Sequence, residues 1–124
     1  MDSFLPRHAR AAQPEPETTI LYRMVTAAEL DDIRRSGAFR NPFGIENKYF
    51  AIAAEGATSY AQQAYKAFGD GPFTMVETTI PTRSITPDMR VTVDRNIATV
   101  IVPTPKLSQL SPPHVLSYTP LPGR

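Results

Sequence analysis

The alternation of hydrophobic and polar positions predicts a first strand that carries one cation, followed directly by a helix. Residues 19–25 are mostly apolar, and Arg23 interrupts them near their end. Thr26 and Glu29 then stand at the spacing of a capping box, and apolar residues at helical spacing follow them. Gly37 has the conformational freedom that a helix C-terminus needs, so the helix is predicted to end there.

A second strand and a second helix come next. Residues 48–52 predict a short strand that contains the aromatic pair Tyr49 and Phe50. Residues 54–68 carry apolar side chains at helical spacing, and the alanines among them predict close packing against a sheet. The segment 39–47, before this strand, mixes turn residues with apolar side chains, so we expect a loop that covers a site as a lid.

The second half of the chain predicts strands without helices between them. These strands are expected at 73–80, 90–93 and 97–102, with a further edge strand at 115–118. The fold class that follows is α+β, with a mixed, mainly antiparallel sheet and two short helices in the N-terminal half. A doubly wound parallel sheet is disfavoured, because its strands would need crossover helices that the second half lacks.

Length and composition divide the chain into one domain and two tails. Residues 1–18 are rich in proline and show no period, so they are interpreted as a flexible leader. A single domain is expected at 19–118 and a short tail at 119–124, since 124 residues suffice for one modest core. No apolar run approaches the roughly twenty residues of a membrane helix. The chain shows no secretory signal peptide of its own, so export would need a larger parent chain or dedicated machinery.

Charge and cysteine content exclude several classes of site. The net charge is +1, from 13 Lys and Arg against 12 Asp and Glu, which is no general electrostatic footprint for nucleic acid. The absence of cysteine excludes a disulfide scaffold, a thiolate zinc site and a cysteine nucleophile. The sequence also lacks the glycine-rich dinucleotide motif, the Walker motif, the zinc-protease motif and the serine-hydrolase elbow. We therefore expect no metal and no standard nucleotide or hydrolase site.

The residues that remain for chemistry are a cation, an aromatic pair and two late acids. The Arg23 guanidinium needs an anionic partner, either a ligand or an acidic residue of the following helix, unless it reaches solvent. Tyr49 and Phe50 offer aromatic faces, and Glu77 and Asp94 offer carboxylates, with Glu77 either at a solvated edge or in a cleft. These groups suit a ligand with phosphates, an aromatic base and a developing positive charge.

Several short motifs follow one another between Ile20 and Pro103 in a fixed order. They are Leu21-Tyr22-Arg23, Ala28-Glu29-Leu30 with Ile33, Gly37 with Phe39, Lys48-Tyr49-Phe50-Ala51, Ala57 with Tyr60-Ala61, and the strand end from Val76 to Pro81. In order and spacing they resemble the ADP-ribosyltransferase-like toxin domains found at the C-termini of bacterial Rhs and contact-dependent polymorphic toxins.

This resemblance implies an NAD site. In that family a first-strand arginine holds NAD through its phosphates or ribose, a second-strand motif shapes the nicotinamide pocket, and a late glutamate supports the cationic transition state. No glutamate precedes the valine run at 97–102, so Asp94, Asn96 or Glu77 would have to take that role. The catalytic candidates are Arg23, Tyr49, Glu77 and Asp94. The residues expected to bind NAD are Tyr22, Arg23, Lys48, Tyr49, Phe50 and Tyr60.

The resemblance also implies a biological setting. NAD would be a substrate, and its ADP-ribose would pass to a macromolecular acceptor, protein or nucleic acid, or to water. The domain would be secreted as part of a larger bacterial toxin and act in the target-cell cytoplasm as a monomer, without membrane insertion, opposed by a cognate immunity protein. Two other functions stay open. One is a small ribonuclease that uses Tyr, Lys, Arg and His114, and the other is a non-catalytic interaction module that docks through proline-rich tails and paired aromatics.

Overall fold

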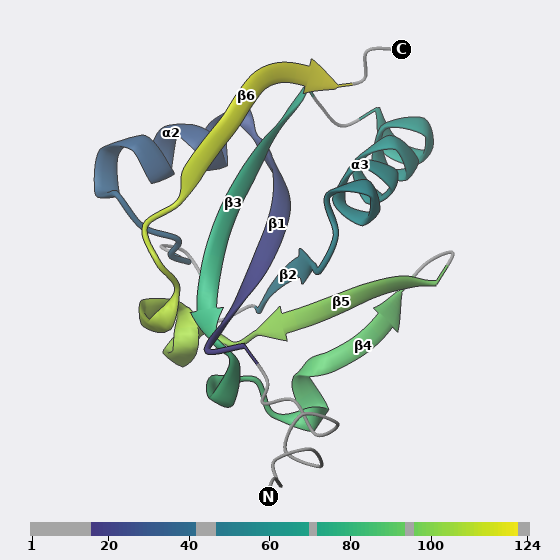
Figure 1. The fold of residues 1–124 in the computed structure, drawn as a ribbon. Coiled ribbons are helices and arrows are strands. Elements are labelled where there is room, and N and C mark those ends of the chain that lie inside the picture. The colour runs from purple at the N-terminus through teal and green to yellow at the C-terminus, as the bar shows by residue number, and fades with distance from the viewer. Residues whose placement is uncertain (1–15, 42–46, 70–71, 94–95, 122–124) are drawn as a thin grey trace, which may run out of the picture.

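The protein forms a six-stranded antiparallel sheet with two helices in the N-terminal half of the chain (Figure 1). The computed structural model describes residues 16–41, 47–69, 72–93 and 96–121. The strands are β1 (Thr18–Thr26), β2 (Lys48–Ala51), β3 (Phe73–Pro81), β4 (Arg90–Val93), β5 (Ile97–Val102) and β6 (His114–Leu121), in the order β4-β5-β2-β1-β3-β6. The helices are α2 (Ala27–Ser36) and α3 (Ala54–Phe68), and three 3₁₀ turns lie at Thr82–Ser84, Pro87–Met89 and Thr104–Gln109. The predicted α+β class is confirmed, but every described strand pairing is antiparallel, so the sheet is not mixed.

The sheet consists of two three-stranded halves that meet at a narrow junction. β1 pairs with β3 along its whole length, from Thr18 opposite Pro81 to Thr26 opposite Phe73. β1 pairs with β2, in the described part of the chain, only where Tyr22 stands opposite Ala51. We call this junction of β1 and β2 the seam. In Figure 1 β1, β3 and β6 run side by side, and β5 and β4 continue the sheet on the other side of β2.

The first helix begins and ends where the sequence predicts. The Thr26 hydroxyl accepts a hydrogen bond from the Glu29 amide at 3.3 Å, and Gly37 adopts φ 75° while its N–H donates to the Ile33 carbonyl. The capping box is only half formed, because the Glu29 side chain does not return to Thr26. It bonds Arg23 instead, six residues before it in the sequence.

The main core lies on the face of the sheet that α2 covers. Leu30 and Ile33 of α2 pack there, together with Phe39. The Phe39 ring meets the Phe50 ring edge to face, with centroids 5.1 Å apart. The side chain of Phe39 is therefore a core residue and not part of an exposed loop. The remainder of the expected lid, 42–46, lies outside the described residues. The largest fully buried side chains are Phe50, Leu21, Ile80, Val25, Val76, Val100 and Val102.

The second helix packs closely on the opposite face, as its alanines predict. Ala57 and Ala61 are buried against the sheet. Gly56 allows the close approach, because a Cβ atom added there would lie 2.9 Å from Cγ2 of Ile97. The helix therefore lies directly above the part of the sheet that includes the seam.

The ends of the domain extend slightly beyond the predicted limits. β1 begins at Thr18, and the Glu17 carbonyl accepts a hydrogen bond from the Thr82 amide at 2.9 Å. The predicted edge strand at 115–118 is longer, since β6 runs from His114 to Leu121 beside β3. Most of the predicted leader, 1–15, lies outside the described residues. Within the described ranges, no helix is long and apolar enough to cross a bilayer.

Candidate functional site

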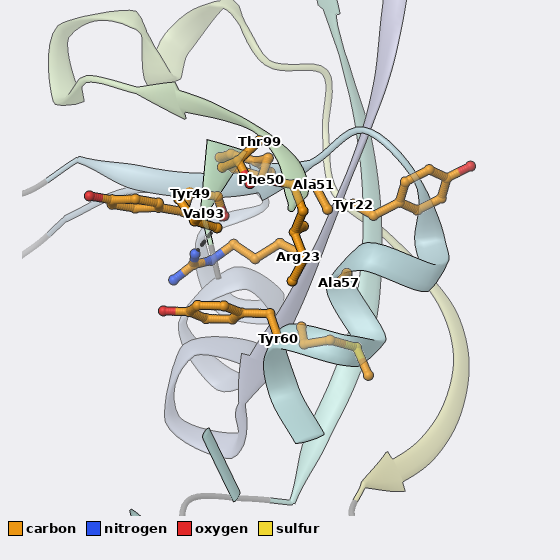
Figure 2. Close-up of a pocket in the computed structure, with 11 residues that line it drawn as sticks. Tyr22, Arg23, Tyr49, Phe50, Ala51, Ala57, Tyr60, Val93 and Thr99 are labelled. Atoms are coloured by element: carbon orange, nitrogen blue, oxygen red, sulfur yellow. Dashed lines mark hydrogen bonds between the residues drawn. The ribbon is translucent and has the colours of Figure 1, made fainter. Parts of the chain in front are cut away.

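A small pocket opens at the seam, between the two halves of the sheet and beneath α3 (Figure 2). Residues of β1, β2, α3 and β5 line it, together with Val93 at the end of β4. Among the described residues β1 and β2 share one residue pair there, so the hydrogen-bonded ladder does not close the space between them. The small Ala57 side chain leaves room below the helix, and Tyr60, one turn later, stands at the rim of the pocket.

Arg23 bridges the seam from β1. Its Nη1 donates to the Tyr49 carbonyl on β2 at 2.9 Å. Its Nε and Nη2 donate to the two carboxylate oxygens of Glu29 at 2.8 and 3.0 Å, which is the bidentate geometry of a strong charge-assisted pair. One of the two partners expected from the sequence, an acidic residue of the following helix, is therefore confirmed. The guanidinium also lies over the Phe50 ring, 5.8 Å from its centroid.

Lys48 contributes a second cation to the same carboxylate. Its Nζ lies 3.3 Å from Oε2 of Glu29, and its side chain is only 10% exposed. The Arg23–Glu29–Lys48 cluster thus contains two positive charges and one negative charge. A partly buried charge without a counterion is costly, so an anion beside this cluster would be stabilised.

The Arg23 fork retains donors for such an anion. A guanidinium has five N–H groups, and three of them bond Glu29 and Tyr49 in the described structure. One N–H on each terminal nitrogen has no partner among the described residues. N–H groups of a guanidinium suit the oxygens of a phosphate or carboxylate.

Two exposed tyrosines flank the Arg23 side chain. Tyr49 of β2 is 44% exposed and Tyr60 of α3 is 46% exposed. Figure 2 shows the Arg23 side chain extending between their rings, with Tyr49 on one side and Tyr60 on the other. The alternation of β2 separates the predicted aromatic pair, because Phe50 points into the core while Tyr49 faces outward. The planar surface available to a ligand is therefore provided by Tyr49 and Tyr60.

Two other predicted NAD-binding residues are placed differently from the expectation. Tyr22 lines the pocket, but its ring points away from Arg23 in Figure 2. Lys48 is buried against Glu29 and is absent from the described residues that line the pocket. Its contribution there is electrostatic, through the carboxylate that it shares with Arg23.

One of the two predicted late acids, Glu77, is described and does not line the pocket. Glu77 of β3 stands opposite Tyr22 on one side and opposite His114 of β6 on the other. Val76 is the residue opposite Arg23, so Glu77 projects from the same face of the sheet as its partner Tyr22, but it is not among the described residues that line the pocket. Asp94 lies outside the described residues. Its described neighbour Val93 lines the pocket, and the alternative Asn96 is exposed with φ 64°.

The pocket is shallow. Its empty volume is about 360 Å³ when counted to its open mouth, but the space that admits a water-sized sphere is about 30 Å³. A space of about 30 Å³ has room for little more than water. A planar ring would therefore lie at the mouth, against the exposed ring of Tyr49 or of Tyr60, because the Arg23 side chain occupies the space between these two rings. A hollow between α2 and the start of β3 has about 410 Å³ of space that admits water, against the 30 Å³ of the pocket at the seam. Asp31 and Arg34 present opposite charges there, and the described residues that line it include no aromatic side chain.

Sequence reasoning did not single out Glu29 as a site residue. Its spacing from Thr26 was sufficient to explain it as a capping residue. A second pattern was available, because a strand cation and an acid in the first turn of the next helix are brought together when the chain turns directly between the two elements. The buried Thr99, which lines the pocket and donates to the Ile97 carbonyl at 3.0 Å, has no comparable pattern in the sequence.

The pKa of Glu29 gives a pH prediction. Burial alone would raise this pKa, but the hydrogen bonds and charges of Arg23 and Lys48 together hold it below the ordinary value of 4.5. A lowered carboxyl pKa stabilises the fold above the unfolded-state value, and that stabilisation is lost as pH falls through the folded-state value. We expect the free energy of unfolding to decrease as the pH falls below 4.5, and to decrease less in Glu29→Gln.

Urea denaturation of both proteins between about pH 7 and about pH 3 measures this difference. The pKa of Asp32 is also lowered, chiefly by its hydrogen bond from Arg40, and the pKa of Asp88 by its hydrogen bond from Thr86. Those groups are present in both proteins, so a difference between them in how the free energy of unfolding depends on pH is caused by Glu29. The same pH dependence in both proteins would contradict the prediction.

The described residues contain no group of three histidine, aspartate or glutamate side chains placed to hold a metal ion. No protein-family model, curated protein or solved structure matches the chain. The interpretation of the pocket therefore rests on its geometry and on the motifs described above.

Proposed function

We propose that the domain binds NAD and transfers ADP-ribose to a macromolecular acceptor, or to water, as a bacterial toxin. The observation that carries this proposal is the Arg23 fork at the seam, which lies between two exposed tyrosine rings and has two N–H groups without a partner among the described residues. The fork and the surplus charge of the Arg23–Glu29–Lys48 cluster favour a diphosphate. The tyrosine rings favour a planar heterocycle beside it.

The proposed reaction breaks the bond between the nicotinamide nitrogen and C1′ of its ribose. Nicotinamide leaves with the electron pair, the ribose develops positive charge, and the acceptor forms the new bond to C1′ and loses a proton. A nearby carboxylate would stabilise that positive charge. Glu77 is not among the described residues that line the pocket, so Asp94, which follows the pocket residue Val93 in the sequence, is our candidate for this carboxylate.

This assignment is tested by incubating the domain with NAD and measuring nicotinamide release and NAD binding separately. Asp94→Asn is expected to lower turnover by about 100-fold or more, because losing one electrostatic stabiliser of a transition state costs about 3–4 kcal/mol. It is expected to leave binding nearly unchanged, and Asp88→Asn, at an exposed 3₁₀ turn, serves as the matched control. Full turnover in Asp94→Asn would contradict the assignment. Absence of NAD turnover in the native domain would contradict the function.

The register of β3 and β6 favours cleavage of RNA as a second candidate function. Glu77 and His114 are directly opposite each other, and Tyr22 stands opposite Glu77 on the next strand. Directly opposite residues have their Cβ atoms about 4.5–5.5 Å apart, so a base and an acid stand side by side on one face. Glu77 would take the proton of the ribose 2′-hydroxyl, whose oxygen bonds to phosphorus, and His114 would give a proton to the departing 5′-oxygen.

The two functions predict opposite effects of the same variants. If RNA is the substrate, Glu77→Gln and His114→Ala abolish the loss of total RNA, and Arg23→Lys has little effect on it. If NAD is the substrate, Arg23→Lys impairs NAD consumption, and the β3 and β6 variants leave it unchanged. Loss of neither substrate in the native domain would favour the interaction module. The toxin setting is part of the NAD proposal, and it rests on the resemblance. It comprises a monomeric domain delivered to a target-cell cytoplasm and an immunity protein that opposes it.

A further inference from the structure

We infer that Glu29 is a positioning residue that fixes the Arg23 fork and the adjacent strand β2 for anion binding. This inference rests on the proposed function. Glu29 occupies the first turn of α2 and contacts neither the described pocket nor the anion expected there. It acts on the pocket through two cations, one on β1 and the other on β2.

The contact with Arg23 determines how the fork is oriented. The two oxygens of Glu29 bond Nε and Nη2, so the guanidinium plane is fixed along one edge. The N–H groups of Nη1 and Nη2 that have no partner among the described residues lie in the plane that this contact fixes. A guanidinium held by one bond would rotate, and bidentate recognition of a phosphate requires a fixed plane.

The contact with Lys48 determines where β2 lies. The seam has one residue pair in the described chain, so backbone bonding alone gives weak control of the spacing between β1 and β2. Glu29 draws Lys48 toward α2 at 3.3 Å, and Arg23 bonds the next residue of β2 at its carbonyl. Both contacts act at the N-terminal end of β2, beyond the backbone pair at Ala51, and together they fix the mouth of the pocket.

The variant Glu29→Gln distinguishes between two ways in which Glu29 could affect anion binding. One is the positioning of the Arg23 fork, and the other is the net charge of the Arg23–Glu29–Lys48 cluster. The glutamine has the same shape, but it presents one acceptor oxygen and one amide donor to two cations. The substitution also raises the charge of the cluster from +1 to +2, because the only carboxylate in it is lost. If charge alone governed anion binding, the affinity would increase. Positioning predicts that it decreases.

The first measurement is the affinity for ADP by isothermal titration calorimetry. Glu29→Gln is expected to weaken ADP binding by about tenfold to 100-fold, since small misplacements of a positioning group have effects of this size. Glu29→Asp retains the charge, but its side chain is one methylene shorter and does not reach both cations from the same backbone position, so it should also weaken binding. Asp31→Asn is the matched control, because this neighbour on α2 forms an exposed pair with Arg35 at 2.9 Å.

The second measurement needs no ligand. The Nε–H resonance of Arg23, assigned by its absence in Arg23→Lys, is expected to exchange slowly with solvent in the native domain. In Glu29→Gln it is expected to exchange rapidly, and in Asp31→Asn it should be unchanged. Thermal unfolding of each variant checks that the domain is folded.

The outcomes are distinct. Weaker ADP binding together with rapid exchange of the Arg23 Nε–H supports the inference. Tighter or unchanged ADP binding in Glu29→Gln overturns it, and so does slow exchange retained in that variant. If the native domain binds neither ADP nor NAD, the proposed function fails, and the exchange measurement alone then shows whether Glu29 fixes the fork.

Discussion

Arg23→Ala is expected to abolish measurable NAD binding, with the affinity falling by about 100-fold or more. Each hydrogen bond between charged groups contributes about 1.5–3 kcal/mol, and the two unused N–H groups of the fork would both be lost. Nicotinamide release should fall with binding. The measurement is titration calorimetry with NAD alongside an assay of NAD consumption.

The same substitution also removes structural bonds, so a milder variant is needed beside it. Arg23→Ala leaves Glu29 with Lys48 alone and removes the bond to the Tyr49 carbonyl. Arg23→Lys retains the charge and loses the fork, so it should fold and still bind NAD weakly. Arg35→Ala is the control, since its pair with Asp31 is 72% and 64% exposed and such pairs contribute little. Native affinity in Arg23→Lys would contradict the assignment of the fork.

Phe50→Ala is expected to destabilise the domain by about 3–5 kcal/mol, which is a large part of the total stability of a domain of this size. Phe50 is 1% exposed, packs edge to face against Phe39 and lies below the Arg23 guanidinium. Removing its ring leaves a cavity between α2 and the sheet. Urea denaturation measures the loss.

The neighbouring residue of the same strand provides the matched control. Tyr49 is 44% exposed, so Tyr49→Ala should change the free energy of unfolding by less than about 1 kcal/mol. It should nevertheless weaken binding of ADP, because one of the two planar surfaces is lost. Equal destabilisation by the two substitutions would show that the alternation of β2 has been assigned to the wrong faces.

Local features of the sequence were sufficient to predict most element boundaries. α3, β4 and β5 begin and end where the periodicity and the flanking residues place them. Each of these limits depends on residues within a few positions of it. The pairing of β1 with β2 at one position depends on two strands far apart in the chain, and no local pattern specifies it.

Several residues of the candidate site could be predicted from the sequence, but most of the contacts between them could not. Arg23 was identified from its charge within an apolar run, and pairing with an acid of the next helix was one of its expected partners. Lys48 was expected to bind NAD because it belongs to the second-strand motif on which the resemblance rests. Strand alternation places it with Phe50 on the buried side, where Glu29 satisfies its charge. The position of Glu77 followed from register, which a single sequence does not reveal.

The narrow seam has a consequence for the order in which the domain folds. β4 and β5 are adjacent in the chain and can pair early, with Val93 opposite Ile97. The pairing of β1 with β3 closes a much longer loop. The junction of Tyr22 and Ala51 joins two halves that already have most of their own backbone bonds, so we expect it to form last. The pocket at the seam would then be absent until the last step of folding.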